Sequence, residues 1–306
     1  MTTPPFKLAM YLPELGLPFE EALPVAADIG AKYIWHNFSL MRNQKTLVEM
    51  SDSEVDAMAA EVKAHGLELF LILSRPHFKQ IHLTDLDTLE DHPDFRRDFD
   101  ALVRCMEVAQ HLNIPAVNAF TFAWPGEYTA QKPTWPMRWL TRGGVIAPVD
   151  LDKLVKAFSL VAEKAEEYQI DVALSMMCWN YTNTTGNFRR VAEAVGSPRL
   201  KVMWGPADNT NCGESDVATA GFLNVRPHLY GLHLKDLRVN DGLALDFDYC
   251  PIGEGDVDYP TVLRNLRDHH CDVYLSVATH FVPESGDKVE AMRINYANLQ
   301  ILIEEL

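Results

Sequence analysis

Short apolar runs alternate with longer amphipathic stretches along almost the whole chain. Short, nearly continuous apolar runs are typical of strands buried on both faces, and apolar residues spaced three and four apart are typical of helices with one face on a core. The pattern predicts strands at Phe6–Tyr11, Tyr33–Asn37, Leu67–Leu73, Ala116–Phe120, Asp171–Met177, Leu200–Trp204, Tyr230–Leu234 and Val273–Val277. It predicts helices at Phe19–Ile29, Ser51–His65, Phe95–Leu112, Asp150–Tyr168, Phe188–Val195, Val217–Arg226, Tyr259–Asp268 and Lys288–Leu306.

Several of these helices have recognisable start and stop signals. Ser51 stands at an N-cap position with Glu54 three residues later, which is the spacing of a capping box, and Gly66 follows as a stop. Asp150 is the expected cap of the helix that runs to Tyr168.

Eight strand-then-helix units predict an α/β protein with a parallel sheet, and eight is the number that closes a (β/α)8 TIM barrel. A doubly wound open sheet is the competing fold, but no GxGxxG phosphate loop follows any predicted strand. A barrel of this kind needs about 250 residues. We therefore expect residues 1–306 to form one single-domain TIM barrel.

The longest irregular stretch is Thr121–Pro148, which is rich in Trp, Pro, Gly and Arg. It follows the fourth predicted strand, so in a barrel it would lie over the catalytic end, where long loops act as lids. We expect it to bring Trp124, and Trp135 or Trp139, towards the centre of that end.

Composition narrows the range of partners. The chain has 47% hydrophobic and 23% charged residues and a formal net charge of −16. This charge opposes binding to nucleic acid or anionic membranes, and we see neither a membrane span nor a secretory signal. The five cysteines are scattered and form no CxxC, which favours a reduced, cytoplasmic protein. The sequence is compatible with a homo-oligomer.

Five residue strings in the second half of the chain have a distinctive order and spacing. They are TNTTG from Thr182, KVMWGPADNTNCGE from Lys201, GLHLKD from Gly231, PIGEGDVDYP from Pro251 and YLSVATHF from Tyr274. Together they resemble the xylose-isomerase-like barrel superfamily, which includes sugar epimerases, inosose dehydratases and endonuclease-IV-like proteins. The resemblance is specific from about Asp171 to Phe281 and architectural before that, and it implies a small-molecule carbohydrate as the partner.

The resemblance also implies a divalent metal, held by a Glu ending strand 5, an Asp ending strand 6, the His of an HxKD string and a Glu ending strand 8. In this sequence Met177, Gly205 and Ala278 stand at three of these positions, and only His233 is retained. One imidazole does not hold a divalent cation, so we expect no cofactor. The weaker alternative is a rebuilt metal site that combines His233 with Asp208 or with a cysteine, Cys178 or Cys212.

Candidate catalytic residues remain at the ends of the last two strands. Alternation places His233 and His280 on the inward or mouth-facing side, where they would serve as acid–base residues, with Lys235 supporting an enolate. The structural alternatives are a histidine hydrogen-bonded in a polar core, a loop histidine without chemistry and an ion pair between Lys235 and Asp236. Candidate substrate-binding residues are His36, Arg75, His77, Trp124, Trp179, Trp204, Asp208 and Asp236.

These features favour an isomerase, epimerase or lyase. It would act on a carbohydrate, polyol or oxo-sugar by proton transfer next to a carbonyl, without the usual metal. The alternative is a non-catalytic sugar-binding or regulatory barrel, or an inactive subunit of a homologous enzyme, because three anionic ligand positions are lost.

Overall fold

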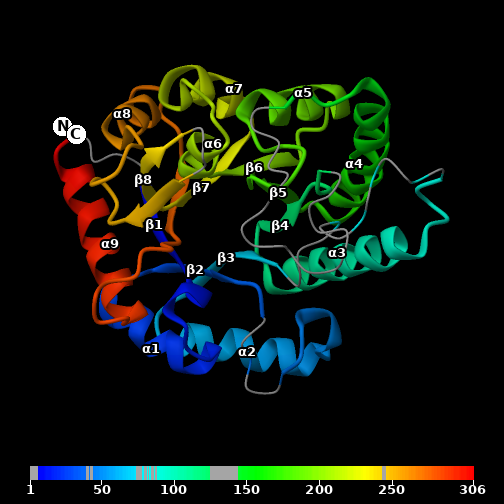
Figure 1. The fold of residues 1–306 in the computed structure, drawn as a ribbon. Helices are drawn as coiled ribbons and strands as arrows, with labels where there is room; N and C mark the ends of the chain where they lie inside the picture. The colour runs from blue at the N-terminus through cyan, green and yellow to red at the C-terminus, as the bar shows by residue number, and fades with distance from the viewer. Residues whose placement is uncertain are drawn as a thin grey trace.

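Parallel strands close into a ring at the centre of the computed structural model, which describes residues 6–38, 41, 44–73, 78, 81, 83, 86, 88–124, 144–242 and 246–306 (Figure 1). Within these residues the barrel strands are β1 (Phe6–Tyr11), β2 (Tyr33–His36), β3 (Glu68–Ile72), β4 (Ala116–Phe120), β5 (Asp171–Ser175), β6 (Leu200–Trp204), β7 (Leu229–Leu234) and β10 (Val273–Val277). Their order around the barrel is β1-β10-β7-β6-β5-β4-β3-β2. The predicted (β/α)8 barrel is confirmed.

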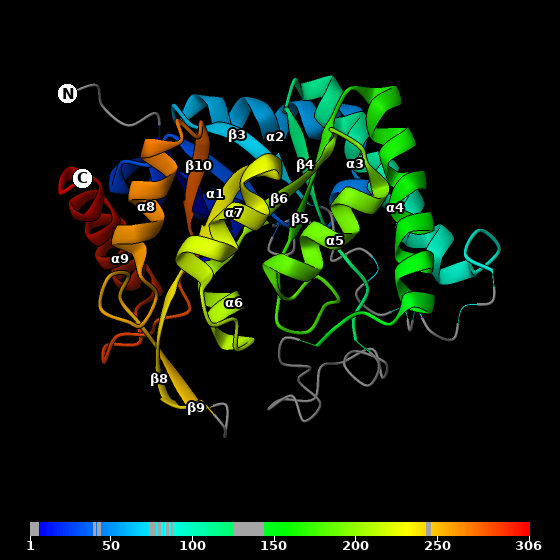
Figure 2. The same cartoon turned by 90° about the horizontal axis from the view of Figure 1, so that it is seen from above.

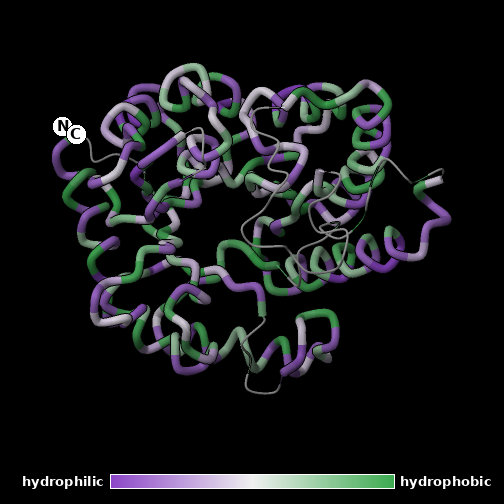
Figure 3. Tube along the Cα trace, in the orientation of Figure 1, coloured by the Kyte–Doolittle hydropathy of each residue, from purple (hydrophilic) through white to green (hydrophobic). Residues whose placement is uncertain are grey.

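Helices surround the strands on the outside of the ring (Figure 1). They are α1 (Phe19–Ile29), α2 (Asp52–Ala64), α3 (Pro93–Leu112), α4 (Pro148–Tyr168), α5 (Thr185–Val195), α6 (Pro206–Asn211), α7 (Phe222–Val225), α8 (Tyr259–Asp268) and α9 (Lys288–Glu304). Hydrophobic and hydrophilic positions alternate along the long helices (Figure 3), as expected where only one face of a helix is buried. No described helix is both long and apolar enough to span a bilayer.

The start of α2 confirms the predicted capping box, because Glu54 N–H donates to Ser51 Oγ and Ser51 N–H donates to the Glu54 carboxylate. The predicted cap of α4 is wrong. This helix begins at Pro148 with Ala147 as its N-cap. Asp150 is instead buried inside the first turn, where its carboxylate accepts a hydrogen bond from Tyr181 Oη. A tertiary contact therefore replaces the local cap.

Side chains alternate between the barrel interior and the layer under the helices. Ala9, Trp35, Ala173 and Met203 belong to an interior cluster, whereas neighbours such as Ile34 pack in the larger cluster between strands and helices. Trp35 crosses the interior and donates from Nε1 to Ser276 Oγ at 2.8 Å. This alternation identifies the inward positions of these strands. Side chains at inward positions near the carboxyl ends of the strands can reach the mouth of the barrel.

An antiparallel hairpin, β8 (Asp236–Asp241) and β9 (Asp246–Cys250), follows β7 directly. It projects beyond the carboxyl ends of the barrel strands, on the same side as α6 (Figure 2). The sequence pattern did not predict this hairpin, because its polar residues resemble a loop. The expected helix at Val217–Arg226 is also irregular, with a π-helical turn at Val217–Gly221 before the short α7.

The predicted lid is only partly described. Its first residues, Thr121–Trp124, lie beside the segment after β5, where Ala123 forms an isolated bridge with Asn180. Trp135, Trp139, Arg75 and His77 lie outside the described residues, so the lid and these two substrate-binding positions stay predictions.

Candidate active site

Buried polar side chains gather at the carboxyl ends of the strands, which is the catalytic end of such barrels. They come from five places: the 3-10 turn Leu12–Leu15 after β1, helix α6 after β6, the end of β7, which supplies two of them, the hairpin strand β9 and the segment after β10. We call this group the mouth cluster, and its members are Glu14, Asp208, His233, Lys235, Tyr249 and His280.

Lys235 and Asp208 form an ion pair within the cluster. Lys235 Nζ lies 3.0 Å from Asp208 Oδ2, and the two side chains are only 1% and 5% exposed. The contact is an ion pair rather than a well-directed hydrogen bond, because Oδ2 has no hydrogen-bond partner among the described residues. Burial lowers the pKa of Lys235, but Asp208, Tyr249 and Glu14 together outweigh it, so the pKa lies above its ordinary value. Lys235 is therefore an ammonium ion.

The absence of a side chain at Gly205 leaves space for the Asp208 carboxylate. This glycine directly follows β6 and is the N-cap residue of α6, and a Cβ atom at this position would overlap Asp208 Oδ2. Even an alanine here would require the Asp208 carboxylate to shift, because interiors are close-packed and do not absorb such an overlap.

His280 links the ammonium to a second carboxylate. Its Nε2 lies 3.4 Å from Lys235 Nζ, and its Nδ1 lies 3.4 Å from Glu14 Oε1. An ammonium can only donate, so Nε2 is assigned as the acceptor and Nδ1 as the nitrogen that carries hydrogen towards Glu14. The ring also meets Tyr249 edge-on at 4.9 Å. At 36% exposed, the His280 side chain is accessible to a ligand.

His233 points into the barrel as predicted, with its ring edge-on to Tyr11 and Trp35 at 5.7 and 5.6 Å. It is 8% exposed, and its Nε2 has no hydrogen-bond partner among the described residues. Burial, followed by the nearby charges of Lys235 and His280, lowers its pKa well below the ordinary range. His233 is therefore a neutral imidazole with one buried ring nitrogen that has no hydrogen-bond partner among the described residues.

Asp236 does not join the cluster and does not pair with Lys235. Its carboxylate is fully buried and accepts hydrogen bonds from the backbone N–H groups of Leu237, Gly253, Gly255 and Val257. Burial raises its pKa, and these N–H donors act against that rise. Asp236 therefore stabilises the conformation of the loop before α8. This role corrects the expectation that its side chain contacts substrate.

His36 and Trp204 lie outside the barrel wall, contrary to the sequence-based expectation. His36 is fully buried between Phe19 and Phe38, and its Nδ1 accepts a hydrogen bond from the Phe38 N–H. Trp204 is fully buried and donates from Nε1 to Asn209 Oδ1 at 2.8 Å. Strand alternation explains both placements, because the inward positions beside them belong to Trp35 and Gly205.

The two remaining tryptophans differ in their surroundings. Trp124 packs in the main core with its ring 4.3 Å from that of Tyr181. Trp179 belongs to a small cluster with Phe120, Met177, Cys178, Ala123 and Cys212. Met177 continues the inward positions of β5, so this cluster borders the same end of the barrel as Lys235, whereas Trp124 is a core residue.

Two members of the cluster were missed at the sequence level. Glu14 lies in the 3-10 turn after β1, and this connection is at the catalytic end in every TIM barrel. The position of Glu14 after the first predicted strand could therefore have been recognised from the sequence. Tyr249 lies on the hairpin strand β9, and burial raises its pKa to about 12. No local pattern places this residue over the barrel.

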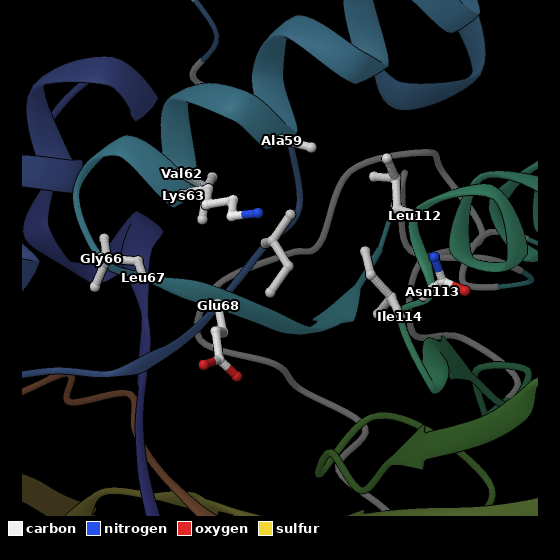
Figure 4. Close-up of a pocket in the computed structure, with 10 residues that line it drawn as sticks. Ala59, Val62, Lys63, Gly66, Leu67, Glu68, Leu112, Asn113 and Ile114 are labelled. Atoms are coloured by element: carbon white, nitrogen blue, oxygen red, sulfur yellow. The ribbon is translucent and has the colours of Figure 1, made fainter.

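A separate cavity of about 520 Å³ lies at the opposite end of the barrel (Figure 4). Most of its lining is apolar, with Lys63 and Glu68 as the charged residues, and it is formed by α2, the end of α3 and the starts of β3 and β4. It is remote from the mouth cluster and contains no candidate acid–base histidine, so we place the candidate active site at the carboxyl ends.

The fold and the position of the cluster define the chain as a (β/α)8 barrel with a polar site at its carboxyl end. The model of the xylose isomerase-like TIM barrel family matches residues 23–294, and the chain belongs to that family. No curated protein sequence matches the chain significantly.

Solved structures of similar fold share little sequence with it. A xylose isomerase-like TIM barrel protein from Mycobacterium smegmatis in complex with magnesium has a TM-score of 0.69 at 16% identity, over 99% of this chain and 97% of that one. D-psicose 3-epimerase with D-tagatose from Clostridium cellulolyticum H10 gives 0.63 at 17%, over 98% and 95%. The probable 3-DHS dehydratase AsbF from Bacillus anthracis gives 0.67 at 16%, over 96% and 98%. At these low sequence identities, the similarity between the structures shows that they share a fold.

The metal that the family resemblance implies does not fit the residues of this chain. Met177, Gly205 and Ala278 offer no charged ligand, and the described residues contain no group of three His, Cys, Asp or Glu side chains suited to an ion. Asp208, the nearest substitute carboxylate, faces the ammonium of Lys235. We therefore derive no chemical step through a metal ion.

Burial of His36 leads to a prediction about stability and pH. Desolvation lowers its pKa to about 3 in the folded chain, whereas an unfolded histidine titrates near 6.5. Below that pH the unfolded chain binds a proton that the folded chain does not, so acid favours unfolding. The free energy of unfolding should fall by about 1.4 kcal/mol per pH unit below pH 6 because of this residue.

Urea denaturation at several pH values between 7.5 and 4.5 measures this slope. His36→Asn retains an acceptor for the Phe38 N–H and should reduce the slope by that amount. An unchanged slope in this variant would show that His36 is not buried as a neutral group.

Proposed function

We propose that the protein catalyses proton transfer next to a carbonyl group in a carbohydrate, polyol or oxo-sugar, without a divalent metal. The outcome would be isomerisation, epimerisation or elimination. The observation that carries the proposal is the continuous arrangement at the carboxyl ends of β7 and β10, in which Lys235 Nζ contacts Asp208 Oδ2 at 3.0 Å and His280 Nε2 at 3.4 Å. Membership of the xylose isomerase-like family, together with the similar folds of the epimerase and the dehydratase named above, supports the substrate class.

His280 is the proposed base. A bound substrate oxygen would take the place of His280 Nε2 at the Lys235 ammonium. The freed Nε2 would take the carbon-bound proton next to the substrate carbonyl, while Glu14 holds the Nδ1–H and stabilises the imidazolium that forms. The electron pair of the broken C–H bond moves to the carbonyl oxygen and gives an enolate. Return of the proton to the other face of the same carbon gives an epimer, and its return to the neighbouring carbon, with a hydroxyl proton moving to the former carbonyl oxygen, gives an isomer. In an elimination, the β-hydroxyl would leave as water with the proton that His280 had taken.

Lys235 is the proposed electrostatic partner of the enolate. A buried ammonium next to the developing negative oxygen stabilises the transition state more than it would in water. His233 takes a different role from the acid–base one expected for it, because a strongly lowered pKa keeps it neutral. Its Nε2, which has no hydrogen-bond partner among the described residues, would instead hold a substrate hydroxyl or carbonyl by a hydrogen bond.

A panel assay tests the proposal. The wild-type protein is incubated in D2O with aldoses, ketoses and 3-oxo-sugars, and NMR follows deuterium incorporation next to the carbonyl. We expect exchange with at least one ligand class. A ligand that binds without any exchange would favour the second candidate, a non-catalytic sugar-binding barrel, which the loss of charge at Met177, Gly205 and Ala278 motivates.

A further inference from the structure

We propose that Tyr249, which lies on the β8–β9 hairpin, is a positioning residue for His280 and keeps that imidazole in place when a substrate oxygen displaces it from Lys235. This inference rests on the proposed function, because it concerns the base of that reaction. It gives a role to a member of the mouth cluster that the proton transfer itself does not use, and to a hairpin that the strand-then-helix pattern does not contain.

The first observation is that His280 is only loosely held by its own hydrogen-bonding contacts. It lies in the irregular segment between β10 and α9, and its side chain is partly exposed. Its two ring nitrogens contact Glu14 and Lys235, each at 3.4 Å, which is long for a hydrogen bond. Once a substrate oxygen replaces Nε2 at Lys235, the contacts that remain to described residues are those with Glu14 and with the Tyr249 ring.

The second observation is the geometry of the ring contact. Tyr249 and His280 meet at a centroid distance of 4.9 Å and an interplanar angle of 67°, close to the edge-to-face arrangement that aromatic pairs prefer. Burial raises the pKa of the Tyr249 hydroxyl to about 12, so the phenol is neutral and does not compete for the proton that His280 takes. The contact therefore restricts rotation of the imidazole without placing a further charge beside it.

The third observation is that the hairpin is fixed at its base. Tyr249 lies opposite the buried Leu237 in the antiparallel ladder. The neighbouring Asp236 carboxylate accepts backbone N–H groups of the loop before α8, and Asp256 of that loop accepts the Val239 N–H at 2.7 Å. The backbone at Tyr249 is thus tied to the barrel through this loop, so its ring offers the imidazole a fixed surface.

The consequence is a specific effect on the chemical step. A general base acts only while its nitrogen stays within hydrogen-bond reach of the proton that it removes. Without the Tyr249 ring, the imidazole could turn away from the substrate on its irregular segment. Loss of the ring should therefore lower the rate of proton transfer more than it lowers the affinity for ligand.

The first test needs no turnover. It uses Asp208→Asn/Lys235→Met, in which the ammonium that contacts His280 Nε2 is absent. NMR relaxation of 13C-labelled histidine, with the signal of His280 identified by its loss in His280→Gln, gives the order parameter of the ring. We expect a value near that of a rigid backbone, about 0.85. Adding Tyr249→Leu should lower it below about 0.6, whereas Tyr249→Phe, which keeps the ring, should leave it high.

The second test is kinetic and uses single variants with the panel ligand that exchanges fastest. Tyr249→Leu should lower kcat by roughly 10- to 10²-fold, because a misplacement of about 1 Å can cost 10²-fold. KM should change much less, and Tyr249→Phe should lose less of the rate than Tyr249→Leu. Phe247→Leu is the matched control, because Phe247 is the other aromatic residue of β9 and contacts Tyr249. This variant should keep both the order of the His280 ring and the rate.

The proposal is overturned if the His280 ring stays ordered in the Tyr249→Leu protein, or is already mobile before Tyr249 is changed. It is also overturned if Tyr249→Phe loses as much as Tyr249→Leu, since the hydroxyl would then be the acting group, or if Phe247→Leu has the same effect. Should Tyr249→Leu not fold, Tyr249→Gln, a flexible side chain without a ring, takes its place. If no panel ligand exchanges, the proposed function fails, while the order parameter still decides whether Tyr249 positions His280.

Discussion

Lys235→Met should slow deuterium exchange into substrate by about 10²- to 10³-fold, the loss typical of removing one group that stabilises a developing oxyanion. The same change leaves the carboxylate of Asp208 buried and unpaired. Breaking a buried pair from one side costs about 3–5 kcal/mol of stability. The variant should therefore lose both activity and stability, as followed by NMR exchange and urea denaturation.

The double variant Asp208→Asn/Lys235→Met separates these two effects. It removes both charges, so it should be more stable than Lys235→Met alone while its exchange stays slow. Recovery of exchange together with stability would mean that Lys235 acts only through the fold. Lys7→Met, at the opposite end of the barrel, should leave exchange near the wild-type rate.

His280→Gln should reduce exchange by about 10²-fold or more, while ligand binding changes little, because a general base contributes about that factor. The His280 side chain is 36% exposed, so a polar replacement of similar length should not disturb folding. The measurement is exchange at saturating ligand, with Kd determined separately by calorimetry.

His233→Gln provides the contrast. Glutamine can still present a hydrogen-bonding group near the position of Nε2, so a neutral binding residue should tolerate it with a loss mainly in affinity. A rate loss in His233→Gln as large as that in His280→Gln would contradict the separate roles given to the two histidines. Unchanged exchange in both variants would exclude both from the proton transfer.

The fold was predictable because each strand and its following helix carry their own local signals. Alternating apolar runs indicated the barrel strands, and capping residues such as Ser51 marked helix starts. Period-two alternation also placed His233 and Ala278 on the inward side, where the structure has them. The same rule, applied with equal strictness, would have turned His36 and Trp204 outward.

The site itself was less predictable, because it depends on contacts between distant segments. Asp208 was recognised as the nearest substitute carboxylate, but its pairing with Lys235 requires the packing of α6 against the end of β7. The polar residues of the β8–β9 hairpin have no apolar pattern that would reveal Tyr249 at the mouth. Asp236 was misread because three of its four backbone donors lie 17 to 21 residues away, in the loop before α8.

The most direct test of metal-independent proton transfer is the exchange rate of wild-type protein after exhaustive treatment with EDTA. The account predicts that the rate in D2O, with the best ligand of the panel, stays unchanged after chelation and does not increase when Mn²⁺, Mg²⁺ or Zn²⁺ is added. Loss of exchange on chelation, followed by recovery with one equivalent of metal, would contradict it.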